Sequence, residues 1–244
     1  MSSAASSVRA APVVHAPPSA VRVRGALAVV AGAGESPGVY ARFGARIAAD
    51  GYVVAVFETT DAGAAEQWLT AQEHAPRVLV GSDRGAAAVL ALVAVAAAVD
   101  GAIVAGTPTG AADDAAADAA VRTACPVHLG VLGDASARAS AVDPAAEPAA
   151  PVAVPDAEAL ASVAVPVLAI HGAADAVAPF AAARAVLGAI PALELVETVD
   201  GLHDALNDQT HRSVAATVVL WLERLRGAGV DTPIVRVVAP EARR

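Results

Sequence analysis

Three short segments carry side chains that could act together as a nucleophile, an acid and a histidine. The first is GSDRG, in which Gly81 and Gly85 frame Asp83, as in the sharp strand-to-helix turn that presents a nucleophile. In the other two, Asp175 follows the apolar run VLAI and His203 follows LELVETV. A histidine that acts as a base must be held in one tautomer, and a carboxylate that accepts from its Nδ1–H does this. The segments therefore predict a triad of Asp83, Asp175 and His203.

The position that should hold the nucleophile contains an aspartate, and a serine precedes it. Only the apex side chain of such a turn faces the open site, so Ser82 is expected to point off the strand end. A carboxylate that attacks an ester carbonyl forms an anhydride, which is a poor intermediate. Displacement at saturated carbon suits it better, because water activated by His203 can then hydrolyse the alkyl-enzyme ester. We therefore expect Asp83 to be the reacting group.

Three alternatives stay open at this turn. Ser82 could act as the nucleophile. Asp83 could instead serve as a base for water in an ester or thioester hydrolase. Arg84 could simply pair with Asp83, which would make the turn structural in a non-catalytic or cyclase-like binding protein of the same fold.

A further set of residues could stabilise a developing negative charge. An oxyanion hole needs two backbone N–H groups aimed at one point. The amide of Arg84, directly after the nucleophile position, is one candidate, and the amide of Ala33, in the Gly-Ala-Gly loop 32–34, is the other. The loop could instead cradle a phosphate at the start of a helix. It is no dinucleotide fingerprint, because Pro37 stands where the last glycine is required.

The elements that would position these residues alternate along the chain. Continuous apolar runs predict strands at 26–31, 52–57, 77–80, 101–105, 167–170 and 193–199. Helices are expected at 39–50, 61–68, 86–99, 180–189 and about 206–226. This alternation predicts an α/β fold, with a doubly wound, mostly parallel central sheet flanked by helices on both faces.

A single α/β domain is expected over residues 23–244, preceded by a flexible N-terminal arm at 1–22. The alternation breaks at about 107–163, which is rich in alanine and proline and contains no strong strand. An excursion at this point lies above the carboxyl ends of the strands, so we interpret it as a small irregular lid. A low-complexity linker is the alternative.

The charge and composition of the chain limit the classes of partner that we expect for it. The net charge of −9 and the pI near 5.0 argue against nucleic acid or an anionic membrane as the main partner. The only cysteine, Cys125, fits a reducing cytoplasm, and the longest apolar run, 86–99, is too short to span a bilayer. No cluster has metal-ligand spacing, so we expect neither a metal nor a cofactor. We expect a cytoplasmic protein with a small-molecule substrate, and the sequence is compatible with a homodimer.

Residues 24–226 together resemble the α/β-hydrolase superfamily, in particular small bacterial hydrolases without a large cap domain. The resemblance is strongest in PVLAIHGAADAVAPFAAARAVLGAIPALELVETVDGLHDALND. In that family the acid precedes a short Val-x-Pro turn, as Asp175 precedes Val177-Ala178-Pro179, and the histidine follows a glycine-rich turn. The resemblance implies a hydrolase with Asp83, Asp175 and His203 as its triad.

The string Asp83-Arg84-Gly85-Ala86 also resembles the elbow of fluoroacetate dehalogenases. There the arginine after the nucleophile helps to hold a substrate carboxylate, which implies a substrate-binding role for Arg84. The chain departs from those enzymes at Ala87, where they carry a second arginine. It also has Ala31 where the superfamily usually has a histidine before the glycine of the oxyanion loop.

Overall fold

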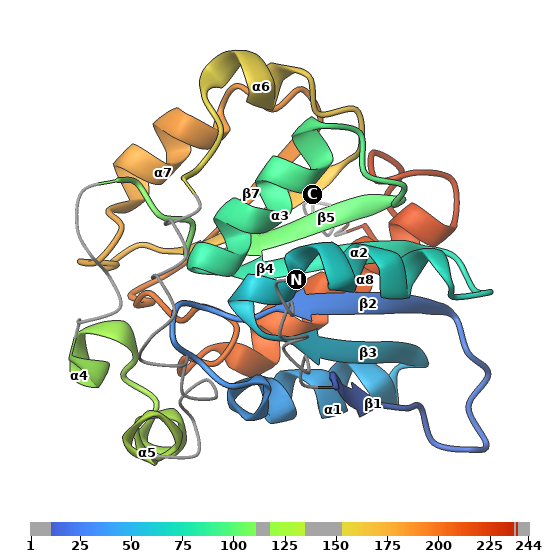
Figure 1. Ribbon diagram of the computed structural model, residues 1–244, viewed down its shortest axis with the longest axis horizontal. Helices are drawn as coiled ribbons and strands as arrows, with labels where there is room; N and C mark the ends of the chain where they lie inside the picture. The colour runs from blue at the N-terminus through green and yellow to red at the C-terminus, as the bar shows by residue number, and fades with distance from the viewer. Residues whose placement is uncertain (1–10, 111–117, 135–152, 237, 239–244) are drawn as a thin grey trace, which may run out of the picture.

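The computed structural model describes residues 11–110, 118–134, 153–236 and 238. Its centre is a seven-stranded sheet with the strand order β1-β3-β2-β4-β5-β6-β7 (Figure 1). The strands are β1 (Val13–His15), β2 (Gly25–Val30), β3 (Tyr52–Phe57), β4 (Arg77–Ser82), β5 (Gly101–Ala105), β6 (Val167–Gly172) and β7 (Leu193–Thr198). All neighbouring pairs are parallel except β1 with β3, which is antiparallel.

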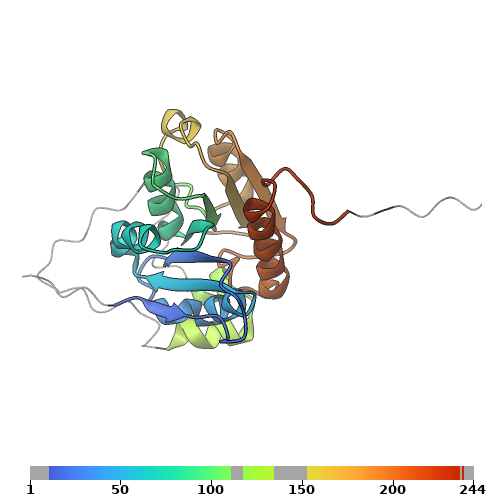
Figure 2. The same ribbon diagram turned by 90° about the vertical axis from the view of Figure 1, so that its right-hand side faces the viewer.

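Helices cover both faces of the sheet, as Figure 2 shows from the side. The α-helices are α1 (Ala41–Ala49), α2 (Ala62–Thr70), α3 (Arg84–Ala94), α4 (Ala119–Arg122), α5 (Pro126–Gly133), α6 (Ala157–Ala161), α7 (Phe180–Leu187) and α8 (His211–Arg226). Two short 3-10 helices, η1 (Pro37–Tyr40) and η2 (Thr59–Asp61), precede α1 and α2. None of the described helices is long and apolar enough to cross a membrane.

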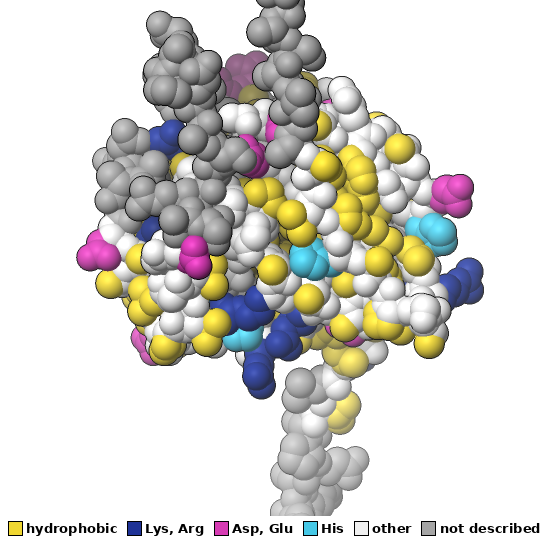
Figure 3. All heavy atoms as spheres, turned by 60° about the horizontal axis from the view of Figure 1, so that its bottom comes forward, with side chains coloured by type: hydrophobic (Ala, Val, Ile, Leu, Met, Phe, Trp, Pro, Cys, Tyr) yellow, Lys and Arg dark blue, Asp and Glu magenta, His cyan; other side chains and the backbone are white. Residues whose placement is uncertain are grey.

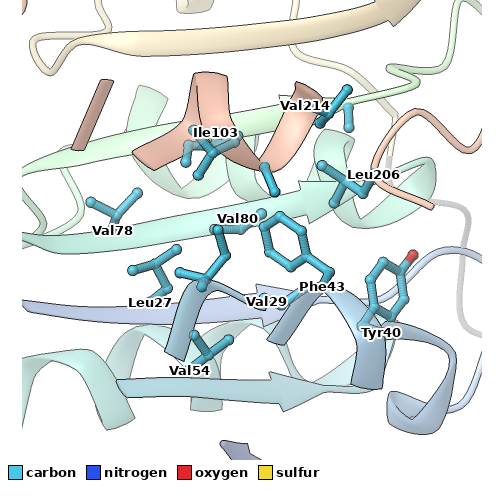
Figure 4. Close-up of a cluster of buried hydrophobic side chains, with 14 of the residues drawn as sticks. Leu27, Val29, Tyr40, Phe43, Val54, Val78, Val80, Ile103, Leu206 and Val214 are labelled. Atoms are coloured by element: carbon cyan, nitrogen blue, oxygen red, sulfur yellow. The ribbon is translucent and has the colours of Figure 1, made fainter. Parts of the chain in front are cut away.

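The core has two layers, one on each face. Side chains alternate along a strand, so each strand of the middle of the sheet contributes to both layers. One layer packs under α1 and α8, where Phe43 and Val214 meet strand residues such as Val29 and Val80 (Figure 4). The other layer packs under α2, α3, α6 and α7. Burial on both faces explains why the central strands are continuous apolar runs.

The surface of the first layer has a local charge opposite to that of the whole protein. Figure 3 shows basic side chains gathered on the face that comes forward from the bottom of Figure 1. Burial and the positive charges of Arg42, Arg46 and Arg212 lower the pKa of His211 at the start of α8. The basic residues of α1 and α8 therefore lie close together, although the chain carries a net charge of −9.

From the neighbouring strands β2 and β4, the chain continues in opposite directions across the sheet. From β2 the chain runs outward to β3, and it returns on the other side of β2 to form β4. The loops that leave β2 and β4 therefore diverge at the carboxyl edge, which is where open α/β sheets bind ligands. Ala33 lies on the first of these loops and Asp83 on the second.

The predicted α/β fold is confirmed, and three expected boundaries are wrong. The expected helix 86–99 ends at Ala94, because Ala96 adopts a φ of 66°, which a helix does not allow. The last helix begins at His211 rather than near 206, because turns bonded to side chains occupy the preceding residues. Val13–His15 was expected in a flexible arm, but it pairs with β3 in the sheet.

The segment predicted as a lid is described only in part, because residues 111–117 and 135–152 lie outside the described residues. In the described part, α4 and α5 adjoin the carboxyl edge, where the Arg122 carbonyl accepts from the Asp204 amide at 2.9 Å. Helix α6 instead packs into the second core layer through Leu160, which is fully buried. The lid stays a prediction for the remainder.

The close contact of α3 with the backbone at the end of β2 leads to a prediction about stability. A Cβ on Gly85 would overlap the backbone carbonyls of Val30 and Ala31, whereas a Cβ on Gly63 in α2 would meet no heavy atom within 4 Å. We expect Gly85→Ala to lower the free energy of unfolding by about 1–3 kcal/mol or more. Gly63→Ala should be neutral or stabilising by less than about 1 kcal/mol. Urea denaturation measures both, and equal effects would contradict the close packing of the turn.

Candidate active site

The turn between β4 and α3 forces Asp83 into an unusual backbone conformation. Its φ of 52° and ψ of −124° lie in a region that side chains other than glycine rarely adopt. The Asp83 amide donates to the Ala105 carbonyl at 3.0 Å, which holds the turn against β5. The side chain at the apex is fully buried and faces the carboxyl edge of the sheet. The structure thus has the strained strand-to-helix turn that the glycine spacing predicts.

The two oxygens of the Asp83 carboxylate have different surroundings. Oδ2 accepts from the Ala33 amide at 3.1 Å. Oδ1 lies 3.6 Å from Nε2 of His203. Both Oδ1 and this Nε2 are buried, and neither has a hydrogen-bond partner in the described part of the chain. The backbone therefore holds one oxygen and leaves the other beside the histidine.

Asp175 fixes the other side of the His203 ring. Nδ1 of His203 lies 2.8 Å from Oδ2 of Asp175, and the opposite oxygen accepts from the amides of Val177 and Ala178 at 2.9 Å each. His171 lies 3.0 Å from the same Oδ2 and 2.6 Å from the Ala178 carbonyl. The carboxylate is thereby oriented by backbone and side chain together, and it directs Nε2 of His203 at Asp83.

Charges near the histidine shift the pKa values of this triad. Burial alone would lower the pKa of His203, but the hydrogen bond with Asp175 and the nearby negative charges of Asp175 and Asp83 raise it to about 10. Burial would raise the pKa of Asp83, and the contacts with His203 and Arg122 overcome this and lower it. The pKa of Asp175 is well below its usual range, despite burial, because of His171 and His203. At neutral pH the resting site therefore holds an imidazolium between two carboxylates.

Side chains hold the predicted oxyanion loop in place, although the chain has Ala31 at the position where the superfamily usually has a histidine. The Gly32 amide lies 3.0 Å from the Tyr40 hydroxyl and 3.2 Å from Oε2 of Glu35. Tyr40 donates to that same Oε2 at 2.5 Å. Thr59 donates to the carbonyls of Ala31 and Gly32 at 2.8 and 2.6 Å. Since protein groups bind the Gly32 amide, and Asp83 binds that of the next residue, the geometry does not favour the phosphate cradle.

A buried arginine connects this loop to the histidine. Nη2 of Arg122 donates to Oε1 of Glu35 and to Oδ1 of Asp204, each at 2.9 Å. Its Nη1 lies 3.6 Å from Oδ2 of Asp83, and the Arg122 side chain is 7% exposed. Asp204 also bonds His128 of α5 at 2.9 Å. Burial and the Asp204 charge raise the pKa of Glu35 to about 7, against the lowering effect of Arg122.

The structure brings the three residues of the predicted triad together, and the Ala33 amide donates to Asp83. Arg84 begins α3 directly after Asp83, and its side chain is partly exposed. The rival Ser82 ends β4, where its buried hydroxyl is hydrogen-bonded to Tyr40. A serine in that contact is oriented toward the oxyanion loop, which does not favour its role as a nucleophile.

Sequence reasoning missed the residues of the charge cluster around Arg122. Asp204 and Asp208 both precede α8, but neither caps it, because the N-cap is Thr210, without a side-chain cap bond, and the first turn contains no acidic residue. The Asp208 carboxylate instead accepts from the loop amides of Leu202 and Ala124 at 2.9 and 2.8 Å. No spacing rule links Arg122 to partners 87 and 82 positions away, so motif reasoning had no signal for this cluster.

Comparisons with known proteins identify the fold of the chain. No family model and no curated protein matches the sequence. Among solved structures, a soluble variant of monoglyceride lipase from Saccharomyces cerevisiae aligns with a TM-score of 0.68 and 12% identity, covering 88% of this chain and 91% of that one. A Paleococcus ferrophilus monoacylglycerol lipase gives 0.66 at 13% identity, with 86% and 97% covered.

The esterase domain of a Rhodothermus marinus protein gives a TM-score of 0.61 at 18% identity, covering 88% of this chain and 93% of that chain. These identities are too low to transfer an activity or a substrate. Together with the strand order, these matches show that the chain has the fold of the α/β-hydrolase superfamily.

Proposed function

We propose that the protein is a hydrolase of small organic molecules in which Asp83 is the nucleophile and His203, oriented by Asp175, is the base. The observation that carries the proposal is the unequal environment of the two Asp83 oxygens. Oδ2 is bound by the Ala33 amide, while the buried Oδ1 faces Nε2 of His203. The Arg84 amide would add the second backbone donor, and its side chain would hold an acidic group of the substrate.

The first step would be displacement at a saturated carbon. Oδ1 of Asp83 donates an electron pair to that carbon, and the bond to the leaving group breaks with its pair, as for a halide or an epoxide oxygen. The product is an alkyl ester of Asp83. In the second step His203 takes a proton from water, whose oxygen adds to Cγ of Asp83. The Cγ–Oδ1 bond then breaks, and the alcohol leaves with the proton that His203 took from water. The new carboxylic acid passes the second proton of the water to His203, which restores the carboxylate and the imidazolium.

The charges of the resting site support this sequence of steps. An imidazolium with a pKa of about 10 is a poor base at neutral pH, and Asp83 is one of the two carboxylates that keep it protonated. Alkylation converts Asp83 into a neutral ester, so His203 loses one of its two partners. Its pKa should then fall, and the ring can lose a proton and become the base for water. In this proposal, the charge state of Asp83 determines whether His203 can act as a base.

An ester or thioester hydrolase with Asp83 as a base for water is the second candidate. It is favoured by the fold neighbours, which include an esterase domain, a monoacylglycerol lipase and a monoglyceride lipase. In that mechanism no bond forms between enzyme and substrate. A covalent adduct on Asp83 therefore separates the two candidates.

His203→Ala tests the proposed mechanism, because it removes the base of the second step and leaves the nucleophile. Incubation with haloacids, epoxides and activated esters, followed by intact-mass measurement, should reveal an adduct on Asp83 that the wild-type protein does not accumulate. Turnover should be lost. Hydrolytic turnover that survives His203→Ala, or a variant that never forms an adduct, would contradict the alkyl-enzyme route.

Substitutions at the turn decide between Asp83 and Ser82. Asp83→Asn should remove most activity, because an amide neither attacks carbon nor accepts a proton. Ser82→Ala should cost less than about tenfold in kcat/KM, or about 1.4 kcal/mol. Asp83→Ser restores an ordinary serine elbow beside His203 and should yield weak esterase activity. Labelling of Ser82 in the wild-type protein by a serine-directed phosphonate would overturn the assignment.

The titration of His203 tests the electrostatic argument without a substrate. NMR of the ring C–H signals should give a midpoint near pH 10 in the wild-type protein. Asp83→Asn removes one of two stabilising charges, so the midpoint should move down toward the ordinary value near 6.5. Asp175→Asn should also lower it, and Asp200→Asn, at an exposed residue, serves as the control. An unchanged midpoint in Asp83→Asn would refute the proposal that the charge state of Asp83 controls His203.

A further inference from the structure

We propose that the guanidinium of Arg122 completes the oxyanion hole and acts in the second step, the hydrolysis of the Asp83 ester. This inference rests on the proposed function, because the relevant oxyanion forms on the enzyme's own carboxylate. The sequence predicted only the backbone amides of Ala33 and Arg84 as oxyanion donors, and the inference adds a cationic side chain to them.

The chemistry of the second step concentrates charge on a single atom. Oδ1 carries the alkyl group, so Oδ2 is the carbonyl oxygen of the ester. Addition of water to Cγ moves the C=O electron pair onto Oδ2, which then bears a full negative charge until Cγ–Oδ1 breaks. The donors already facing Oδ2 are the Ala33 amide at 3.1 Å and Nη1 of Arg122 at 3.6 Å. Arg122 therefore faces the oxygen that becomes the oxyanion.

The guanidinium is held in place before any reaction. Its Nη2 is bound by Glu35 and Asp204, and Nε lies 3.4 Å from the second Asp204 oxygen. These bonds involve the Nε and Nη2 atoms of the planar guanidinium group, and they fix its orientation so that Nη1 faces Asp83. The side chain is 7% exposed, so water screens its charge little. A fixed cation in a dry site stabilises a developing charge without reorganisation, and this is the most effective form of such catalysis.

The two steps should respond to Arg122 in opposite directions. In the resting enzyme Oδ2 shares the negative charge of the carboxylate, and alkylation removes that charge. Arg122 therefore stabilises the ground state of the first step more than its transition state, which does not help that step. In the second step the charge on Oδ2 grows, so Arg122 stabilises the transition state. A residue that merely held the fold together would slow both steps alike.

Rapid-quench intact-mass measurement of the full-length protein separates the two steps. The reagent is whichever haloacid, epoxide or ester alkylates His203→Ala, and that variant is the positive control for adduct formation. In Arg122→Gln we expect alkylation at least as fast as in the wild-type protein and ester hydrolysis slower by about 10²–10³-fold. The alkyl-enzyme should accumulate. Arg184→Gln, which removes an exposed charge on α7, should change neither rate.

Removing Arg122 takes a cation away from three buried carboxylates, those of Glu35, Asp83 and Asp204, which threatens the fold. The double variant Arg122→Gln/Asp204→Asn removes a charge of each sign and allows the same measurement in a charge-balanced protein. Arg122→Lys keeps the cation but lacks the fork that spans Glu35 and Asp83. We expect both variants to accumulate the alkyl-enzyme, with thermal melting measured on each.

The outcomes separate this inference from the proposed function. If His203→Ala forms no adduct with any reagent, the alkyl-enzyme route fails and the role of Arg122 fails with it. If His203→Ala forms an adduct, but the Arg122 variants slow both steps equally or slow neither, the route stands and the oxyanion role of Arg122 is overturned. Slower hydrolysis with undiminished alkylation in the charge-balanced variant supports it.

Discussion

A fully buried carboxylate at the turn between β4 and α3 sets the requirements for the rest of the site. An unpaired buried charge costs several kcal/mol, so Asp83 can remain ionised only with partners of opposite charge or with N–H donors. Three elements supply them: the loop after β2 provides the Ala33 amide, the loop after β7 provides His203, and α4 provides Arg122. Each loop is in turn held by its own contacts, and the ion cluster joins them. The geometry at the carboxyl edge follows from this one charge.

Much of the fold could be predicted because its signals are local. Apolar runs predicted β2 to β7 to within two residues at each end, and 52–57 and 101–105 have the observed bounds, whereas the short β1 was missed. The triad was predictable because each member directly follows a strand, and parallel strands bring their carboxyl ends to one edge. The ion cluster could not be predicted from the sequence, because Arg122 contacts Glu35 and Asp204 only through tertiary packing. Helix ends failed where alanine-rich sequence carries no stop signal, as after Ala94.

Aspartate at the turn changes where the fold must supply positive charge. With a serine nucleophile the oxyanion forms on the substrate. A cation fixed at that position would have to leave room for the carbonyl group of each substrate molecule that binds. In the mechanism that we propose for Asp83, the oxyanion forms on an atom of the protein, so a cation can be fixed against it by folding alone. Glu35 serves this arrangement twice, since one of its oxygens bonds Arg122 and the other bonds Tyr40 beside the oxyanion loop. The loop and the cation are therefore positioned by the same side chain.

The arrangement also implies a compromise between holding the nucleophile and using it. Every contact that keeps Asp83 ionised in a buried site lowers the energy of the carboxylate and so weakens it as a nucleophile. The contacts are divided between the two oxygens in a way that limits this loss. The two donors that persist through the reaction face Oδ2, while Oδ1 meets only the ring of His203 among the described residues. In the proposed mechanism the attacking oxygen is thus the less tightly held one, and the oxygen that would later carry the charge is the one that the donors already face.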